Sequence, residues 1–145
     1  MELQKIISWL KSWPGWQEGA KLYVDYTDTV PGNCGLFPIG TEEVSRKADV
    51  LGNLTAVYRF RFVLYRVVEH TDDGAQSAQW AQDLQEWVRQ QNSLGLAPVL
   101  GDDPARENIL AEKGRLYKTR QPGNRMYAVD FTAEFIKFYE VKENG

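Results

Sequence analysis

The sequence predicts an α+β fold in which a twisted antiparallel sheet carries two main helices on one face. In two segments apolar residues recur every three or four positions, which is typical of helices that cover a core. Elsewhere apolar and polar residues alternate, and the order helix, strands, helix, strands lacks the regular alternation of a parallel sheet. The length of 145 residues and the absence of a linker-like segment predict one domain over residues 1–145.

The first helix is expected near the N-terminus, where apolar side chains follow a helical spacing at Leu3, Ile6, Ile7, Leu10 and Trp13. Pro14 and Gly15 then end it. A short strand follows in "KLYVDYT", and the turn residues after Asp28 predict a loop. "CGLFPIG" is interpreted as an edge or bulged strand, since Pro38 cannot donate a backbone hydrogen bond.

The polar segment "TEEVSRKADVLGN" is interpreted as an extended arm that ends in a turn at Gly52–Asn53. A long strand with clean alternation, "LTAVYRFRFVLYRVVE", follows at residues 54–69. One side of this strand carries the aromatic residues Tyr58, Phe60 and Phe62. That side is therefore expected to point into the core.

The second helix is expected to begin at an N-cap, Asp72 or Asp73, and to end near Ser93. Its apolar stripe contains Trp80, Leu84, Trp87 and Val88. The segment 96–108 is rich in turn residues and is expected to be a loop. Two final strands, "GRLYKTR" and "RMYAVDFTAEFIKFYEV", are expected to flank a turn at residues 122–124. Their alternation blurs near the end, which indicates a bulge or burial of both faces.

Composition limits the function. The net charge of -3 argues against nucleic acid as the main partner. The single cysteine excludes an internal disulfide and is typical of a reducing cytoplasm. The first residues lack the features of a signal peptide, and no apolar segment approaches the roughly twenty residues that cross a bilayer. We expect a protein of the cytoplasm, or one made there and built into a larger assembly, with no membrane partner.

No group of residues indicates catalysis. His70 is the only histidine, and Cys34 is more typical of a small buried side chain than of a nucleophile. Three acidic pairs, at residues 42–43, 72–73 and 102–103, are explained as strand, cap and turn positions. The glycine-containing segments lack the ending of a phosphate-binding loop. We therefore expect no enzyme activity, no cofactor and no metal.

The second face of the long strand has a mixed character. Arg59 and Arg61 share it with Val57, Val63, Tyr65 and Val67. A polar face of an antiparallel sheet is commonly just solvated. Arginine beside tyrosine and aliphatic residues, with little lysine, is instead the composition enriched at the cores of protein interfaces. On composition alone, an interface and a plain surface are both open.

Several motifs follow one another along the chain: "WLKSW", "YRFRFVLYRV", Trp87 with Gln91–Asn92, "LAPVL", "GRLY" at residues 114–117 and "FIKFYE" at residues 135–140. In order and spacing they resemble a family of small phage and prophage proteins of Gram-positive bacteria, often labelled minor capsid or minor tail proteins. Each motif consists of core aromatics and turn residues, so the match depends on their collinearity. Ala97, inserted before Pro98, is a departure from the family's loop.

That family looks like the tail-terminator proteins of long-tailed phages. The resemblance implies a ring, typically hexameric, that caps the tail tube and joins it to the filled head. Its partners would be further copies of itself, the tail-tube protein and the head-completion protein, at the head–tail joint of the virion. Neighbours in a closed ring present two different surfaces to each other. Arg59, Arg61 and Tyr65 would then meet an acidic patch next door, either Glu42–Glu43 or Asp102–Asp103.

Two alternatives stay open from the sequence. The first is a head-completion or stopper protein on the other side of the same joint. The second is a small-ligand-binding or regulatory α+β domain, which would be a monomer or dimer with a concave apolar cavity.

Overall fold

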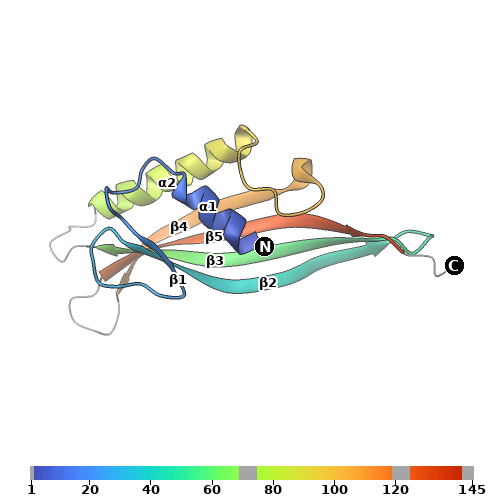
Figure 1. Ribbon diagram of the computed structural model, residues 1–145, viewed down its shortest axis with the longest axis horizontal. Helices are drawn as coiled ribbons and strands as arrows, with labels where there is room; N and C mark the ends of the chain where they lie inside the picture. The colour runs from blue at the N-terminus through green and yellow to red at the C-terminus, as the bar shows by residue number, and fades with distance from the viewer. Residues whose placement is uncertain (1, 69–74, 119–124, 142–145) are drawn as a thin grey trace.

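The computed structural model describes residues 2–68, 75–118 and 125–141 of the chain. Their strands form one sheet in the order β1-β2-β3-β5-β4. The strands are β1 (Leu22–Val24), β2 (Cys34–Ala48), β3 (Leu54–Val68), β4 (Asn108–Lys118) and β5 (Arg125–Tyr139). The helices α1 (Glu2–Lys11) and α2 (Ala75–Ser93) lie on the same face of the sheet (Figure 1), which confirms the α+β prediction.

The sheet is mixed, because β1 runs parallel to β2 while the other three pairs are antiparallel. The expectation of a purely antiparallel sheet is wrong at this edge. A parallel pair normally needs a long crossover, but β1 is so short that the segment 25–33 can return to its start. The Asp28 carboxylate holds that segment by accepting hydrogen bonds from the Val30 backbone at 3.0 Å and from Asn33 Nδ2 at 2.9 Å.

The core lies between the two helices and the inner face of the sheet. Trp9 of α1 stacks on Trp87 of α2 with ring centroids 4.8 Å apart, and Phe62 of β3 stacks on Phe131 of β5 at 4.6 Å. The predicted aromatic side of β3 is confirmed, since Phe60 and Phe62 are both buried. The predicted stripe of α2 is confirmed as well by burial at Trp80, Leu84 and Val88.

Strand β2 is longer than expected, because it continues through most of the polar segment that precedes the turn. Two β-bulges, at Ile39 and Val44, shift its register against β3. Gly40 has a φ of +139°, which a residue with a side chain rarely adopts. Pro38 is tolerated within the strand, because β1 pairs with β2 only as far as Leu36 and β2 is an edge strand beyond that point.

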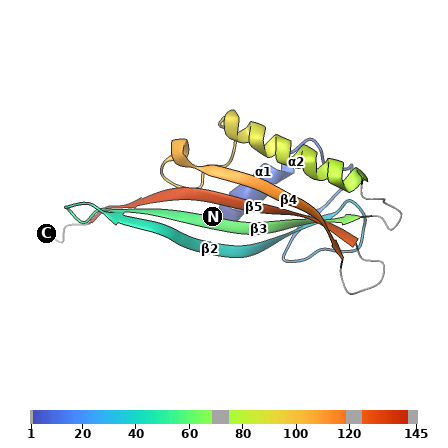
Figure 2. The ribbon, with the colours of Figure 1, turned by 180° about the vertical axis from the view of Figure 1, so that it is seen from behind.

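One end of the sheet projects past the helical layer (Figure 1). This arm consists of residues 44–55 from β2, β3 and their turn, together with residues 138–141 at and after the end of β5. The turn lies at residues 49–53, which confirms the position that the sequence predicts. Seen from behind, the sheet covers α1 and presents a face that carries no described helix (Figure 2).

Strand β4 begins at Asn108, whereas the sequence predicts a loop up to this residue and a strand only from Gly114. A bulge lies between Glu112 and Arg115, and it hides the alternation that would identify the earlier half of the strand. The predicted N-cap at residues 72–73 and the predicted turn at residues 122–124 lie outside the described residues.

Candidate interaction surfaces

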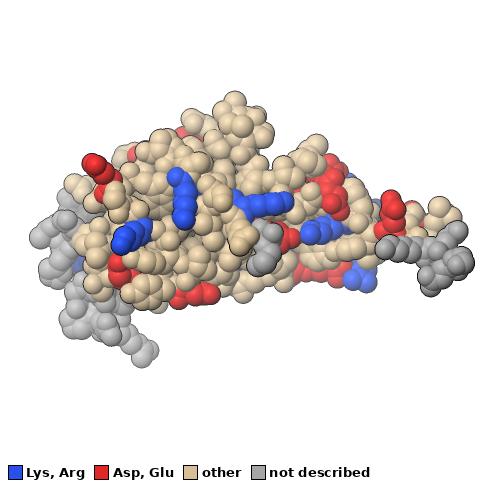
Figure 3. All heavy atoms as spheres, viewed as in Figure 1, with Lys and Arg blue, Asp and Glu red and all other residues tan. Residues whose placement is uncertain are grey.

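The surface that carries the helices shows basic and acidic groups intermixed (Figure 3), so candidate charges must be judged by their individual contacts. The opposite surface, which we call the outer face, is the side of the sheet without described helices. Strand β3 contributes Arg59, Arg61 and Tyr65 to it, alternating with the core residues. The sequence predicts these three residues as interface candidates.

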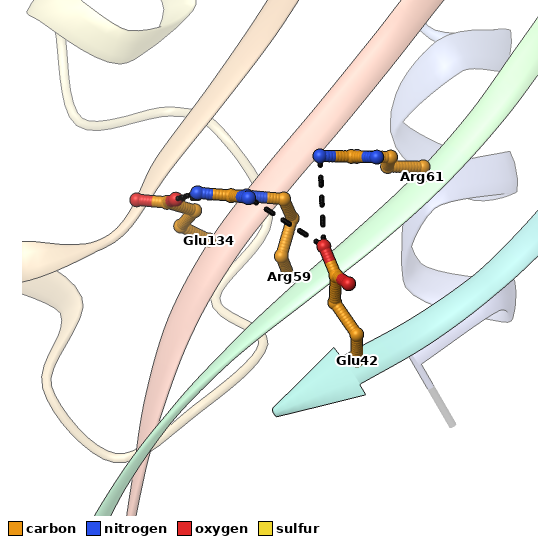
Figure 4. Close-up of polar contacts among 4 residues, drawn as sticks. All are labelled: Glu42, Arg59, Arg61 and Glu134. Carbon is orange, nitrogen blue, oxygen red and sulfur yellow. Dashed lines mark hydrogen bonds and ion pairs between the residues drawn. The ribbon is translucent and has the colours of Figure 1, made fainter. Parts of the chain in front are cut away.

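Arg59 lies at the centre of a row of charges that crosses three strands (Figure 4). Its Nε and Nη2 donate to Glu134 Oε1 of β5 at 3.0 and 2.7 Å. Its Nη1 lies 3.5 Å from Glu42 Oε1 of β2. The same oxygen lies 3.5 Å from Nη2 of Arg61. Glu42 is therefore an internal partner of both arginines within the chain.

The bulge at Ile39 creates this charge row. Pro38 lies opposite Phe62, and Gly40, not Ile39, lies opposite Arg61. Without the extra residue, the uncharged Thr41 would lie opposite Arg59. With it, Glu42 takes that position, where opposite charges on neighbouring strands stabilise the sheet.

The two arginines differ in what they leave for a partner. The Arg59 side chain is 28% exposed and is fixed by Glu134, whereas the Arg61 side chain is 47% exposed and forms an ion pair only with Glu42 among the described residues. A charged side chain whose donors are engaged in internal hydrogen bonds has fewer donors free to bind another molecule. Arg61 is therefore the stronger interface candidate of the two.

Tyr65 belongs to an aromatic row farther along the outer face. Its ring centroid lies 5.3 Å from that of Phe37 on β2 and 5.4 Å from that of Tyr117 on β4, both in edge-on contact. Desolvation raises the pKa of Tyr65 above its usual value. Arg115 and Asp130 form an ion pair of 3.0 Å on neighbouring strands of the same face. The outer face thus combines an aromatic row with cross-strand ion pairs.

The predicted acidic patches do not form as pairs. Glu43 lies opposite Tyr58, on the other face from Glu42, and its carboxylate pairs with Arg46 at 2.8 Å. Asp102 binds the edge of β5, because its Oδ2 accepts a hydrogen bond from the Phe138 backbone at 2.8 Å.

Asp103 precedes a short 3-10 helix, Pro104–Arg106, and its nearest cation is Arg106 at 3.8 Å. In the part of the chain that the structure describes, no ion pair joins Asp102 or Asp103 to the arginines of β3. Asp103 consequently has the longest ion pair of the acidic candidates that form one, although its side chain is only 26% exposed.

Cys34 has the environment of a core residue. Its side chain is completely buried at the start of β2, and burial raises the pKa of the thiol to about 12. His70 lies outside the described residues. Within residues 2–68, 75–118 and 125–141, no cluster of three His, Cys, Asp or Glu side chains is arranged to hold a metal ion. Among the described helices, none is both long and apolar enough to span a bilayer.

Sequence reasoning missed the apolar character of the arm. Its turn presents Val50 and Leu51 to solvent, and Phe138, Tyr139 and Val141 are also exposed at the end of β5. The sequence contains a signal for the turn, since Asp49, Gly52 and Asn53 are turn-forming residues. No local pattern shows that the helices stop short of it.

Comparison with known proteins adds no identification: no family model matches the chain, and no curated protein sequence matches it significantly.

Proposed function

We propose that the protein is a structural component of a phage particle, a tail terminator whose copies form a ring that caps the tail tube and joins it to the head. The motif resemblance is the starting point. Its polar members have structural roles in this chain. Gln91 accepts a hydrogen bond from Trp9 Nε1 at 3.0 Å, and Asn92 Nδ2 donates to the Ile109 carbonyl. Gln91 therefore connects α2 to α1, and Asn92 connects α2 to β4, so these motif residues hold the fold together.

The outer face is the observation that carries the proposal. It combines a half-exposed arginine, Arg61, with the aromatic row around Tyr65. Arginine and tyrosine are enriched where protein interfaces are buried. A ring subunit needs a surface of this kind that differs from the surface it meets on its neighbour. In the proposed ring, Arg61 donates hydrogen bonds to a carboxylate of the next copy, and Asp103, whose own ion pair is the longest at 3.8 Å, is the candidate.

The test compares Arg61→Glu with Arg89→Glu. Both arginines are exposed and each has an internal carboxylate partner, but Arg89 lies on α2 and pairs with Glu86 on the same helix. We expect light scattering to show a multi-subunit ring for the wild-type protein and for Arg89→Glu. Arg61→Glu should be a monomer with unchanged circular dichroism. A ring that persists in Arg61→Glu would contradict the role of the outer face.

The position at the head–tail joint needs its own experiment. Purified protein should bind the ends of tail-tube polymers and stop their growth, which electron microscopy of tube lengths would show. A head-completion protein would bind the head connector and leave tube growth unchanged. The two results separate the terminator from its nearest alternative.

A further inference from the structure

The turn at the end of the arm is rigid. The Asp49 carboxylate accepts hydrogen bonds from the backbone of Leu51 and of Asn53, both at 2.9 Å, and from Asn53 Nδ2 at 3.1 Å. Asn53 Oδ1 in turn accepts a hydrogen bond from the Val141 backbone at 3.0 Å, which ties the end of β5 to the turn. We call residues 49–53 the arm tip. Its conformation is fixed before it meets any partner, which lowers the entropy cost of binding.

The arm tip is also apolar at its most exposed point. Val50 is fully exposed, and Leu51 is 76% exposed. Among the described residues, these two side chains belong neither to the core nor to the residues packed against it. Large apolar side chains at the end of a rigid projection are typical of a contact site.

A groove suited to such a tip lies between the end of α1 and β1. Its apolar lining comes from Trp13, Trp16, Leu22 and Tyr23, and its volume is about 700 Å³. Trp16 is fixed by a hydrogen bond from its Nε1 to the Leu10 carbonyl at 2.7 Å and by edge contact with Trp13 at 5.5 Å. We call this site the tryptophan groove. Tryptophan and tyrosine are the side chains that most often dominate the energy of an interface.

One pair of charges at the two sites is complementary. Lys11, Lys21 and Glu18 line the rim of the tryptophan groove. The arm carries Asp49 at the tip and Lys47 just before it. The hydrogen bond from the Asn53 side chain is the largest cause that lowers the pKa of Asp49, so this carboxylate is negative at neutral pH. Asp49 is held by the turn's own hydrogen bonds, so the charge that the tip leaves for a partner is Lys47, which is opposite in sign to Glu18 in the groove.

The arm tip and the elements that line the groove, the segment after α1 and β1, lie toward opposite ends of the molecule (Figure 1), so a chain cannot fill its own groove. A second copy of the chain brings both the apolar side chains and a lysine, Lys47, that is complementary to Glu18. We propose that the arm tip of each copy inserts Val50 and Leu51 into the tryptophan groove of the next copy. The contact joins two different surfaces, so it repeats from copy to copy, as a ring requires. This inference rests on the proposed self-assembly.

Cross-linking tests the contact directly. A variant with Val50→Cys and Lys21→Cys is treated with a short bismaleimide, and mass spectrometry maps the links. Cys34 is fully buried and does not compete. We expect a ladder of multimers with links between positions 50 and 21. The matched control, Val50→Cys with Leu96→Cys, places the second thiol at an exposed apolar residue beside a different groove and should give no ladder.

A charge exchange provides the second test. Lys47→Glu and Glu18→Lys should each lower self-association at least several-fold in sedimentation measurements, and the double variant should recover it. Both residues are exposed, and neither forms an ion pair among the described residues, so both single variants should fold. Recovery of this kind requires that the two positions face each other in the assembly.

The cross-linking results distinguish a failure of this inference from a failure of the proposed function. A wild-type ring without links between positions 50 and 21 would overturn this inference and leave the proposed function standing. Links from position 50 to position 96, or only to an added tail-tube protein, would also overturn it, because the occupant would be another site or another partner. Links between positions 50 and 21 without any binding to tail tubes would support it and remove the phage role.

Discussion

Glu42 of β2 and Arg59 of β3 are directly opposite each other on the outer face, with their charged atoms 3.5 Å apart. The stronger partner of Arg59 is nevertheless Glu134 of β5, at 2.7 Å. Arg59 thus links the three central strands, whereas Arg61 touches only one carboxylate among the described residues. Two arginines that look equivalent in the sequence therefore differ in their internal contacts: Arg59 links three strands, and Arg61 is the candidate for contact with another molecule.

Truncation separates these roles. Arg59→Ala should lower the urea midpoint of unfolding clearly more than Arg61→Ala, because it leaves Glu134 without its hydrogen-bond donors. The difference should shrink in about 1 M salt, where partly exposed charges are screened. Glu134→Ala supplies the control: the double variant Arg59→Ala/Glu134→Ala should lose less stability than the two single losses added together. Equal midpoints for the two arginine variants would contradict this assignment.

Asn92 covers an edge of the sheet. Its side-chain amide donates to the Ile109 carbonyl at 2.6 Å and accepts from the Ile109 backbone at 3.3 Å, and Gln85 donates to the Ala111 carbonyl at 3.2 Å. These groups lie at the edge strand β4. Asn92→Ala should reduce the free energy of unfolding by about 2 kcal/mol, since it leaves two partly buried backbone groups without partners.

The control for Asn92→Ala is Gln90→Ala, an exposed position on α2 without such a contact. Its effect should stay within about 0.5 kcal/mol. Asn92→Ala should also aggregate more readily during refolding, because an uncovered edge strand can pair with other chains. Equal losses in the two variants by urea titration would show that α2 does not protect this edge.

The features that follow from local periodicity were predictable. The aromatic side of β3 and the buried stripe of α2 are visible as spacing in the sequence. The pairing of Glu42 with Arg59 is not, because it depends on a single unpaired residue, Ile39, in the neighbouring strand. A shift of one residue exchanges the two faces of a strand, and nothing local fixes where the shift occurs.

The direction and the length of a strand are also set by tertiary structure. The three residues of β1 contain no signal that distinguishes a parallel from an antiparallel partner. The polar residues at the end of β2 look like a loop, because there the strand lies in the arm and has solvent around it. Exposed strands lack the burial that produces a hydrophobic pattern. The tryptophan groove lies beside β1, and the arm tip follows the end of β2. Of the candidate contact surfaces, only the outer face could therefore be inferred from the sequence.

Gly114 marks a close approach between β4 and α2. A Cβ atom at this position would lie 2.8 Å from the Cβ of Ala81. Gly114→Ala should therefore destabilise the fold by about 1–3 kcal/mol through overpacking. In the double variant Gly114→Ala/Ala81→Gly the contact is relieved, so its loss should be smaller than the sum of the single losses. If the losses of unfolding free energy in this double-mutant cycle were additive in thermal unfolding, β4 and α2 would move apart to accept the new methyl group without a loss of stability.

Cys34 gives the chain a defined response to alkaline pH. Burial is the main reason that the folded pKa of its thiol is raised from the ordinary value of 9.0 to about 12, although Arg66 acts in the opposite direction. Well below pH 9.0 the thiol is neutral in both states and contributes no pH dependence. Between 9.0 and about 12 only the unfolded chain loses the proton, so stability should fall with rising pH. The slope approaches about 1.4 kcal/mol per pH unit.

The comparison with Cys34→Ala isolates this contribution, because the other titrating groups are the same in both proteins. The difference in unfolding free energy between wild type and Cys34→Ala should be constant from pH 7 to about 8.5 and should then shift against the wild type as the unfolded thiol ionises. A thiol reagent at pH 8 should label Cys34 only after unfolding, since thiolate formation and access are both suppressed in the native state. Rapid labelling of the native protein would mean that the start of β2 opens, and that the contact between β1 and β2 is weaker than its hydrogen bonds indicate.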